Sequence, residues 1–171
     1  KNVAYDHDKG KYTTKNIYYY VKLDKGQDNY ALFDSDGTNQ LSYGTKSDNL
    51  KGQGTITAKT LGVGFDTVTK TFTNTTSLQD GGIATSKGGT VGDVTGYTGL
   101  IEKDEDGNKD SVTAKADLDK SHYDNENYGT NKTVTYSVTF TGDDVGNYRL
   151  SDNSAPLVAS TAYETTTTGN T

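Results

Sequence analysis

Apolar and polar residues alternate along several short stretches of this chain, as they do in β-strands that bury one face. The clearest stretch is TVTYSVTF at 133–140, where every second residue is apolar. Successive side chains of a strand point to opposite faces, so this pattern predicts one buried and one exposed face. The stretches at 111–118 and 17–23 show the same alternation. The residues expected to face inward are Val134, Tyr136, Val138 and Phe140 in the first stretch, Val112, Ala114, Ala116 and Leu118 in the second, and Ile17, Tyr19, Val21 and Leu23 in the third.

No stretch repeats apolar residues at the spacing of an amphipathic helix, so the sequence predicts little or no helix. At most, one short helical turn is expected at 43–50. Turn motifs such as DSDG at 34, DEDGN at 104 and TGDD at 141 separate the short predicted strands. This organisation favours an all-β fold, specifically an immunoglobulin-like (Ig-like) antiparallel β-sandwich. The alternative is a mostly-β, β-grasp-like module with one short helix.

One block of sequence occurs twice. YVKLDKGQDNYALFD, which ends at Asp34, aligns with SVTFTGDDVGNYRLSD, which ends at Asp152, if one residue is inserted in the second copy. Leu23 then corresponds to Phe140, 117 residues later, and Tyr30 corresponds to Tyr148, 118 residues later. Repetition at a fixed period indicates a tandem-repeat architecture, in which each repeat is one structural unit.

The repeat predicts the domain organisation. Residues 1–53 are expected to be the C-terminal part of one repeat with a connector, and residues 54–152 one complete repeat. Residues 153–171 are expected to form a tail or the start of a linker to a next repeat. Such repeats are expected to follow one another in an elongated array.

Composition argues for a folded protein despite its low hydrophobicity. Apolar residues make up 30% of the chain and the mean hydropathy is −0.81, values that by themselves suggest disorder. However, the chain has 13 Tyr, 20 Gly and a single Pro. Disordered chains are poor in aromatic residues and often rich in Pro, whereas Tyr, Thr, Val and Gly together suit short strands joined by tight turns.

Several classes of function are disfavoured by composition. The chain has no Cys, which excludes a disulfide framework, a thiol nucleophile and a thiolate metal site. A net charge of −6 and a pI of about 4.8 disfavour binding to nucleic acid or to anionic membranes. No apolar run approaches the length of a membrane span, so membrane insertion is not expected. The first residues are charged and polar rather than a signal peptide, and the sequence is expected to be a piece of a larger protein.

The repeated block resembles a known family. The sequence is similar to the YDG-type repeat of large bacterial surface proteins, chiefly the filamentous-haemagglutinin-like adhesins exported by two-partner secretion. That repeat opens with a Gly-Thr-Ile-Thr strand and a Lys-Thr-Tyr-Asp-Gly-Thr segment, and it closes with a Gly-Ala-Asp-Ala-Gly-Asn-Tyr-x-Leu turn. The eponymous Tyr-Asp-Gly is replaced here by Phe72, Thr73 and Asn74. The matching positions are 54–57, Lys70 and Thr71 in the opening block, and Gly142, Asp143, Asp144, Gly146, Asn147, Tyr148 and Leu150 in the closing block.

The resemblance implies a stalk or spacer module of an adhesin, secreted by a Gram-negative cell or held at its surface. Its partners would be neighbouring repeats of the same chain. The alternative is a ligand-binding tip that recognises a host glycan or host protein. Acidic β-domains of low hydrophobicity stay soluble and separate, which agrees with either role.

Exposed tyrosines are the candidate ligand-binding residues. If Ile17 and Tyr19 face inward, then Tyr18 and Tyr20 face outward, beside Lys22. A rigid, amphipathic Tyr pair can stack on a sugar or anchor a partner protein. The competing interpretation is that the pair covers a neighbouring domain or the connector.

An acidic loop is the candidate metal site. EKDEDGNKD places oxygen ligands at alternate positions before a Gly, which is the arrangement that calcium requires. Two lysines within the loop oppose a bound cation, and the competing interpretation is a plain hairpin turn. No other cofactor is expected. The candidate calcium ligands are Glu102, Asp104, Asp106 and Asp110.

Catalysis is not expected. The two histidines, His7 and His122, lie outside any Ser/His/Asp-like context, and the chain has no Gly-x-Ser-x-Gly motif. Within the closing block, Tyr148 is expected to fill the core while its hydroxyl reaches a backbone group, as a tyrosine corner does in Greek-key sandwiches. The sequence therefore favours a binding or structural protein over an enzyme.

Overall fold

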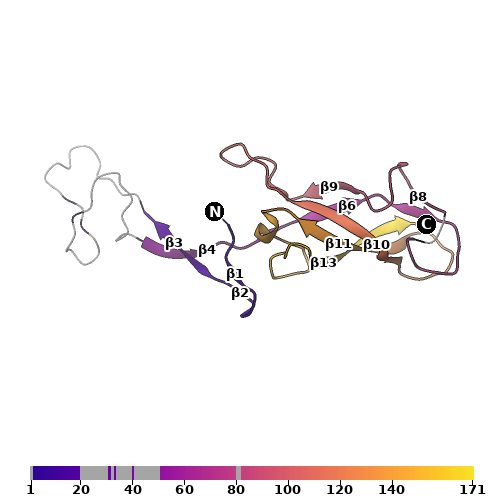
Figure 1. The fold of residues 1–171 in the computed structure, drawn as a ribbon, viewed down its shortest axis with the longest axis horizontal. Coiled ribbons are helices and arrows are strands. Elements are labelled where there is room, and N and C mark those ends of the chain that lie inside the picture. Colours follow the sequence, from indigo (N-terminus) through magenta and orange to yellow (C-terminus); the bar gives the residue numbers. More distant parts are fainter. Residues whose placement is uncertain (1, 20–30, 32, 34–39, 41–50, 80–81) are drawn as a thin grey trace. The chain divides into compact units, whose positions relative to one another are not determined.

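The computed structural model describes residues 2–19, 31, 33, 40, 51–79 and 82–171. The chain divides into two compact units, an N-terminal unit of Val3–Thr57 and a C-terminal unit that contains Ala58–Thr171. Each unit is described by itself (Figure 1). The boundary follows Thr57, four residues beyond the boundary that the repeat predicts after residue 53.

Two antiparallel ribbons form the described part of the N-terminal unit. In the first, β1 (Tyr5–Asp6) pairs with β2 (Lys11–Tyr12). In the second, β3 (Thr14–Tyr18) pairs with β4 (Lys51–Thr55), and Figure 1 shows the two strands side by side. The second ribbon therefore ends at Thr55, two residues into the segment 54–152 that is predicted as one complete repeat.

A three-stranded antiparallel sheet is the main element of the C-terminal unit. Its order is β10–β11–β13, with β11 (Lys132–Thr141) between β10 (Thr113–Tyr123) and β13 (Ala162–Asn170). The register of β10 against β11 shifts between Asp117 and His122, as at a β-bulge. The segment expected to be a tail or linker from residue 153 onward therefore includes an edge strand of the main sheet.

Short pairs of strands complete this unit. The antiparallel pairs are β6 (Gly62–Phe65) with β9 (Val94–Thr98), and β7 (Val68–Lys70) with β8 (Ile83–Thr85). A parallel pair joins β12 (Tyr148–Arg149) to β5 (Lys59–Thr60), and a 3-10 turn at Val145–Asn147 precedes β12. The described residues contain no α-helix, so the all-β prediction is confirmed. The helical turn expected at 43–50 lies outside them, and the Ig-like detail stays a prediction.

The inner face of β11 is the centre of the core, as its alternation predicts. Val134, Tyr136, Val138 and Phe140 are each 0% exposed. The ring of Phe65 on β6 stacks on Tyr136 at a centroid distance of 4.2 Å, so β6 covers this face of the sheet. Inward residues of the neighbouring segment contribute as predicted: Val112, Ala114 and Ala116 are buried, and Leu118 packs against the core partly buried.

Tyr148 fills the core in the predicted manner. Its side chain is fully buried, and its hydroxyl accepts a hydrogen bond from the Ile101 backbone N–H at 3.0 Å. The same hydroxyl donates to the Asp110 carboxylate at 2.6 Å. Burial, and after it this carboxylate, raises the pKa of Tyr148 to about 12. Tyr148 therefore attaches β12 to the loop after β9.

The end of β13 bonds to β7. Asn170 is fully buried, and its side-chain oxygen accepts a hydrogen bond from the Val68 backbone N–H at 2.8 Å. Its side-chain nitrogen donates to the backbone carbonyls of Lys132 and Thr167, each at 3.1 Å. Thr171 continues the pairing, since its N–H donates to Val68 and its carbonyl accepts from Lys70. One buried amide thus connects β7, β11 and β13.

The third predicted strand differs from its prediction. Ile17 and Tyr19, expected to face a core, are 44% and 51% exposed, whereas Tyr18, expected to face outward, is half-buried. Val21 and Leu23 lie outside the described residues. The physical reason is that β3 belongs to a two-stranded ribbon, and the described part of this unit contains no opposing layer like the one that β6 provides over Tyr136.

Candidate functional site

The acidic loop after β9 forms a hydrogen-bonded turn. The Asp104 carboxylate accepts backbone hydrogen bonds from Asn108 at 2.7 Å and Asp106 at 2.9 Å. These bonds, led by the one from Asn108, hold the pKa of the Asp104 carboxyl below its ordinary value. Gly107 adopts a φ of +86°, a conformation that favours glycine, and its N–H donates to the Asp104 carbonyl.

Two of the other candidate calcium ligands have separate partners. Glu102 forms an exposed ion pair with Lys109 at 2.7 Å, and Asp110 turns inward to the hydroxyl of Tyr148. Among the described residues, no group of three or more His, Cys, Asp or Glu side chains gathers as a metal site. The structure therefore does not bring Glu102, Asp104, Asp106 and Asp110 together, and calcium binding at this loop stays a prediction.

The candidate tyrosine site is described only at its first member. Tyr18 lies at the end of β3, opposite Lys51, and is half-buried. Tyr20 and Lys22 lie outside the described residues. The histidines lie in different environments: the ring of His7 contacts Tyr5 edge-on at 4.9 Å, and His122 lies on β10 within hydrogen-bond distance of the Lys120 carbonyl.

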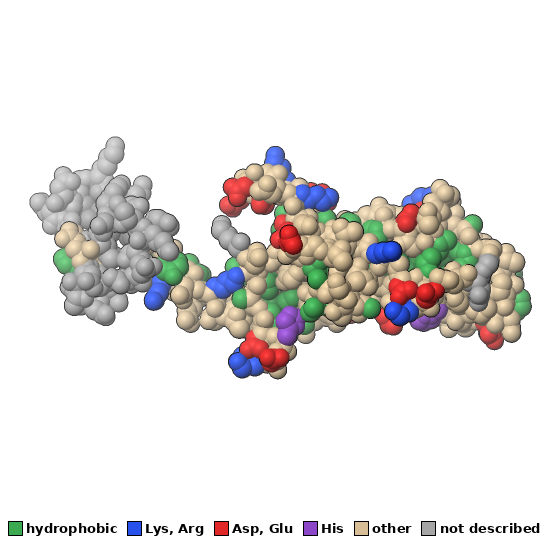
Figure 2. Space-filling view, viewed as in Figure 1, with side chains coloured by type: hydrophobic (Ala, Val, Ile, Leu, Met, Phe, Trp, Pro, Cys, Tyr) green, Lys and Arg blue, Asp and Glu red, His purple; other side chains and the backbone are tan. Residues whose placement is uncertain are grey.

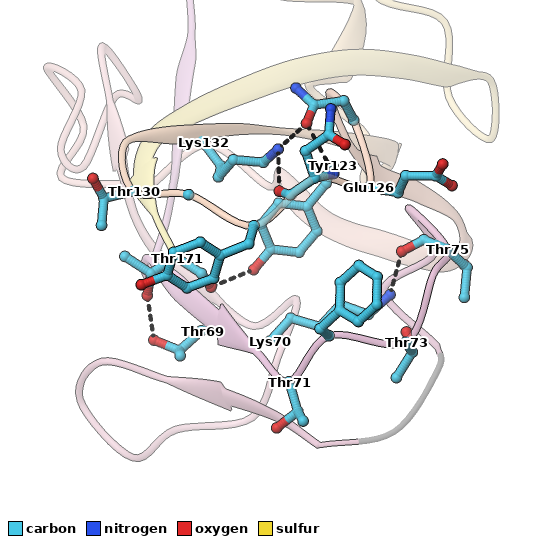
Figure 3. Close-up of a pocket in the computed structure, with 15 residues that line it drawn as sticks. Thr69, Lys70, Thr71, Thr73, Thr75, Tyr123, Glu126, Thr130, Lys132 and Thr171 are labelled. Carbon is cyan, nitrogen blue, oxygen red and sulfur yellow. Dashed lines mark hydrogen bonds between the residues drawn. The ribbon is translucent and has the colours of Figure 1, made fainter.

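A pocket of about 200 Å³ lies at the end of the C-terminal unit where Thr171 meets β7 (Figure 3). It is formed by three separate parts of the chain. One part is 69–75, from β7 into the loop after it, the second is 123–132, from the end of β10 to the start of β11, and the third is Thr171. We call the loop that follows β7 the 71–78 loop and the loop between β10 and β11 the 124–131 loop.

A lysine ammonium holds each of these loops. Lys132, the first residue of β11, is nearly buried and donates to the side-chain oxygen of Asn125 and to the backbone carbonyl of Asn127 in the 124–131 loop, with Asp124 at 3.4 Å. Lys70, the last residue of β7, donates to the carbonyls of Thr75 at 2.8 Å and Ser77 at 2.6 Å in the 71–78 loop. Both cations are therefore satisfied by their own loops, which fixes the shape of the pocket walls.

The base of the pocket is Tyr123, which Figure 3 places between Lys132 and Lys70. Its hydroxyl lies 3.2 Å from the backbone carbonyls of both Val68 and Thr171. Burial raises the pKa of Tyr123 to about 12, so this phenol is a neutral donor at physiological pH.

Two aromatic side chains at the rim are open to solvent. Phe72 in the 71–78 loop is 63% exposed, and Tyr128 in the 124–131 loop is 95% exposed. The hydroxyls of Thr71, Thr73 and Thr130 and the carboxylate of Glu126 also line the pocket. Apolar rings beside uncharged hydroxyls suit a small ligand with both an apolar face and hydroxyl groups.

This pocket is only partly indicated by the sequence. Nothing in the sequence places Phe72 in one pocket with Tyr128, 56 residues later. Tyr128 lies in a polar stretch without strand alternation. The one signal was the loose correspondence of KYTTKN at 11 with NYGTNK at 127, which marks Tyr128 and Tyr12 as repeated positions.

Comparisons with known proteins do not assign the chain. The part of the chain that the structure describes contains no helix long and apolar enough to cross a membrane. No protein-family model matches the sequence, and neither the curated proteins nor the solved structures include a significant match.

Proposed function

We propose that this chain is a structural repeat module of a large bacterial adhesin, secreted or surface-anchored, in which it acts as a stalk or spacer. The observation that carries the proposal is the recurrence of one ribbon. Ile17 lies opposite Gly52 in the first copy, and Val134 lies opposite Thr167 in the second. Val134 follows Ile17 by 117 residues and Thr167 follows Gly52 by 115, so equivalent strands pair in nearly the same register.

The resemblance to the YDG-type repeat supports the extracellular assignment. A spacer needs modules that remain folded and do not collapse onto one another. The hydrogen-bonded ladders of β11 with both of its neighbours supply the first property. The separation of modules agrees with the acidic net charge of the chain. It also agrees with Figure 2, where acidic and basic side chains occur in small separate groups on a mostly uncharged face.

An exchange experiment tests the spacer role. The chain is inserted between a cell-surface anchor and an unrelated binding domain whose ligand is known. We expect ligand capture to increase with each inserted copy, and to increase equally when an unrelated β-domain of similar length replaces the chain. Purified chain is expected to show no saturable binding to a glycan array or to host matrix proteins. Saturable binding by the chain alone would contradict a pure spacer.

A second candidate function is recognition of a host glycan or host protein, as at an adhesin tip. The observation that favours it is the pocket between Phe72 and Tyr128, whose rings are largely exposed while the two lysines nearby are satisfied internally. Neutral sugars bind proteins through aromatic stacking and hydroxyl contacts, and these rim residues offer both. In this alternative the binding tyrosine is Tyr128 instead of the Tyr18 and Tyr20 pair.

Rim variants test this alternative. Phe72→Ala and Tyr128→Ala are each expected to weaken a measured glycan interaction about tenfold or more, since a stacked aromatic contributes on the order of 1–3 kcal/mol. Saturation-transfer NMR with a panel of methyl hexosides and N-acetylhexosamines measures the effect. Tyr19→Ala is the matched control, because Tyr19 is an exposed tyrosine of the other unit. Binding that survives both rim changes would exclude this pocket.

A further inference from the structure

The open face of the β3–β4 ribbon is the surface from which a further interaction can be inferred. This face carries Ile17 and Tyr19 on one strand and Gly52 and Gly54 on the other. A Cβ built on Gly54 would lie 2.6 Å from Ile17 Cδ1, and one on Gly52 would lie 3.0 Å from the Tyr19 hydroxyl. The two large side chains thus lie across the glycines, and Lys15, which pairs with Gly54, is a half-buried member of the same face.

The same face is covered in the C-terminal unit. Adding 117 to Ile17 and Tyr19 gives Val134 and Tyr136, both of which are 0% exposed. What covers them includes β6, whose Phe65 ring lies on Tyr136 at an interplanar angle of 18°. Equivalent positions in the two copies therefore differ in one respect: one copy has an extended strand over its apolar face, and the other leaves two large apolar side chains about half exposed.

The chemistry of the covering strand is known from the C-terminal unit. It reads Gly-Val-Gly-Phe at 62–65, with small residues that let its backbone approach and an aromatic ring that stacks. Gly52 and Gly54 in the open ribbon likewise lack side chains that would hold a covering strand away.

We propose that the Ile17–Tyr19 face of the N-terminal unit is an acceptor for an extended strand of the β6 type, with its aromatic residue seated on Tyr19, supplied by another copy of this repeat. The affinity would come from burying Ile17, Tyr19 and the incoming Phe ring, which are the contacts that the β6–β11 layer makes in the C-terminal unit. This would join repeats by completing an apolar layer. This inference depends on the repeat geometry and not on adhesion, so the acceptor role and the proposed adhesin function can each fail without the other.

A peptide experiment tests the acceptor directly. The probe is a synthetic peptide of residues 58–70, added to the full chain labelled for NMR. We expect saturable shifts at Ile17 and Tyr19, and about tenfold slower amide exchange there when the peptide is at about ten times its dissociation constant. The same peptide with Phe65→Ala should not bind measurably, and neither should the parent peptide added to an Ile17→Thr, Tyr19→Thr chain. Equal binding by the Phe65→Ala peptide would overturn the proposal.

A covalently linked version of the experiment tests the acceptor even if the free peptide binds too weakly to be detected. A copy of residues 58–118 is joined ahead of residue 1, which raises the effective concentration of the strand to the millimolar range. We expect Ile17 and Tyr19 to become protected in this chain, and the protection to be lost when Phe65→Ser is made in the added copy alone. Exposed Ile17 and Tyr19 in the linked chain would also overturn the proposal.

Discussion

Removal of residues 162–171 is expected to leave residues 58–161 without a cooperative fold. The deletion takes away β13, which pairs with β11 from Lys132 to Thr139. It also removes Asn170, whose side-chain oxygen accepts a hydrogen bond from the backbone N–H of Val68. Because this position is fully buried, solvent water does not replace that hydrogen bond. Loss of a whole ladder and its buried connection exceeds the few kcal/mol by which domains are stable. Circular dichroism and a urea titration measure the result.

Point variants in β13 separate the contribution of the buried Asn170 from that of the rest of the strand. Asn170→Ala leaves the buried Val68 N–H and Lys132 carbonyl and the half-buried Thr167 carbonyl without this partner, and each fully buried group left unsatisfied costs about 1–3 kcal/mol. Thr168→Ala is the matched control, because Thr168 is an exposed residue of the same strand, and it should change the free energy of unfolding by less than about 0.5 kcal/mol. A truncated chain that melts like the full chain would mean that β13 is dispensable.

β13 is a strand that no local sequence pattern reveals. The stretch AYETTTTGN has no apolar alternation. Thr suits a pleated, half-buried surface, but a run of Thr does not reveal which face is buried. Its place is set by β11 on one side and by the buried Asn170 at its end. Those are contacts between residues tens of positions apart, which a local pattern does not report.

β11 and β3 show that the same local pattern can lead to different burial. Alternation predicted both strands, and in β11 every inward residue is fully buried. In the N-terminal ribbon the corresponding Ile17 on β3 and Tyr19, the residue after β3, are about half exposed. Alternation specifies which side chains share a face, but whether that face is covered depends on a second layer elsewhere in the chain.

The site residues were predictable only where the chemistry is local. Tyr148 was recognised as a core residue because the Asn-Tyr turn is a compact motif, and the structure confirms its backbone bond to Ile101. The acidic loop matches a calcium pattern, but Glu102 is engaged by Lys109, a lysine within the loop, and Asp110 by Tyr148, which lies 38 residues further along the chain and outside any local pattern. The Phe72–Tyr128 rim joins two distant loops and has no motif of its own.

Raising the pH from about 10 to 12 is expected to unfold the C-terminal unit. Burial raises the pKa of Tyr123, Tyr136 and Tyr148 to about 12, whereas an unfolded tyrosine ionises near 10. A raised folded-state pKa means that the stabilisation is fully present below pH 10 and is lost as the pH rises through 12. Each phenol then contributes a loss of about 3 kcal/mol. Three such losses are comparable with the whole stability of a typical domain.

Tyr136→Phe separates this effect from ordinary packing. The Tyr136 hydroxyl is buried and has no hydrogen-bond partner among the described residues. Replacing it with hydrogen keeps the ring stacked on Phe65 and removes an unsatisfied polar group. We therefore expect neutral or slightly higher stability at pH 7, and at pH 11 a smaller loss than in the parent chain. Urea midpoints at the two pH values measure both.

Tyr148→Phe is the contrasting variant at a second buried phenol. Here the hydroxyl bonds to the Ile101 N–H and to the Asp110 carboxylate, so its removal leaves a donor and a charge without their partner. We expect a loss of about 1–3 kcal/mol at pH 7, combined with the same reduced sensitivity to alkaline pH as Tyr136→Phe. Equal neutral-pH costs for the two variants would contradict the assigned hydrogen bonds. An unchanged alkaline transition in both would show that these phenols do not control it, because each substitution removes one of the protons that unfolding releases.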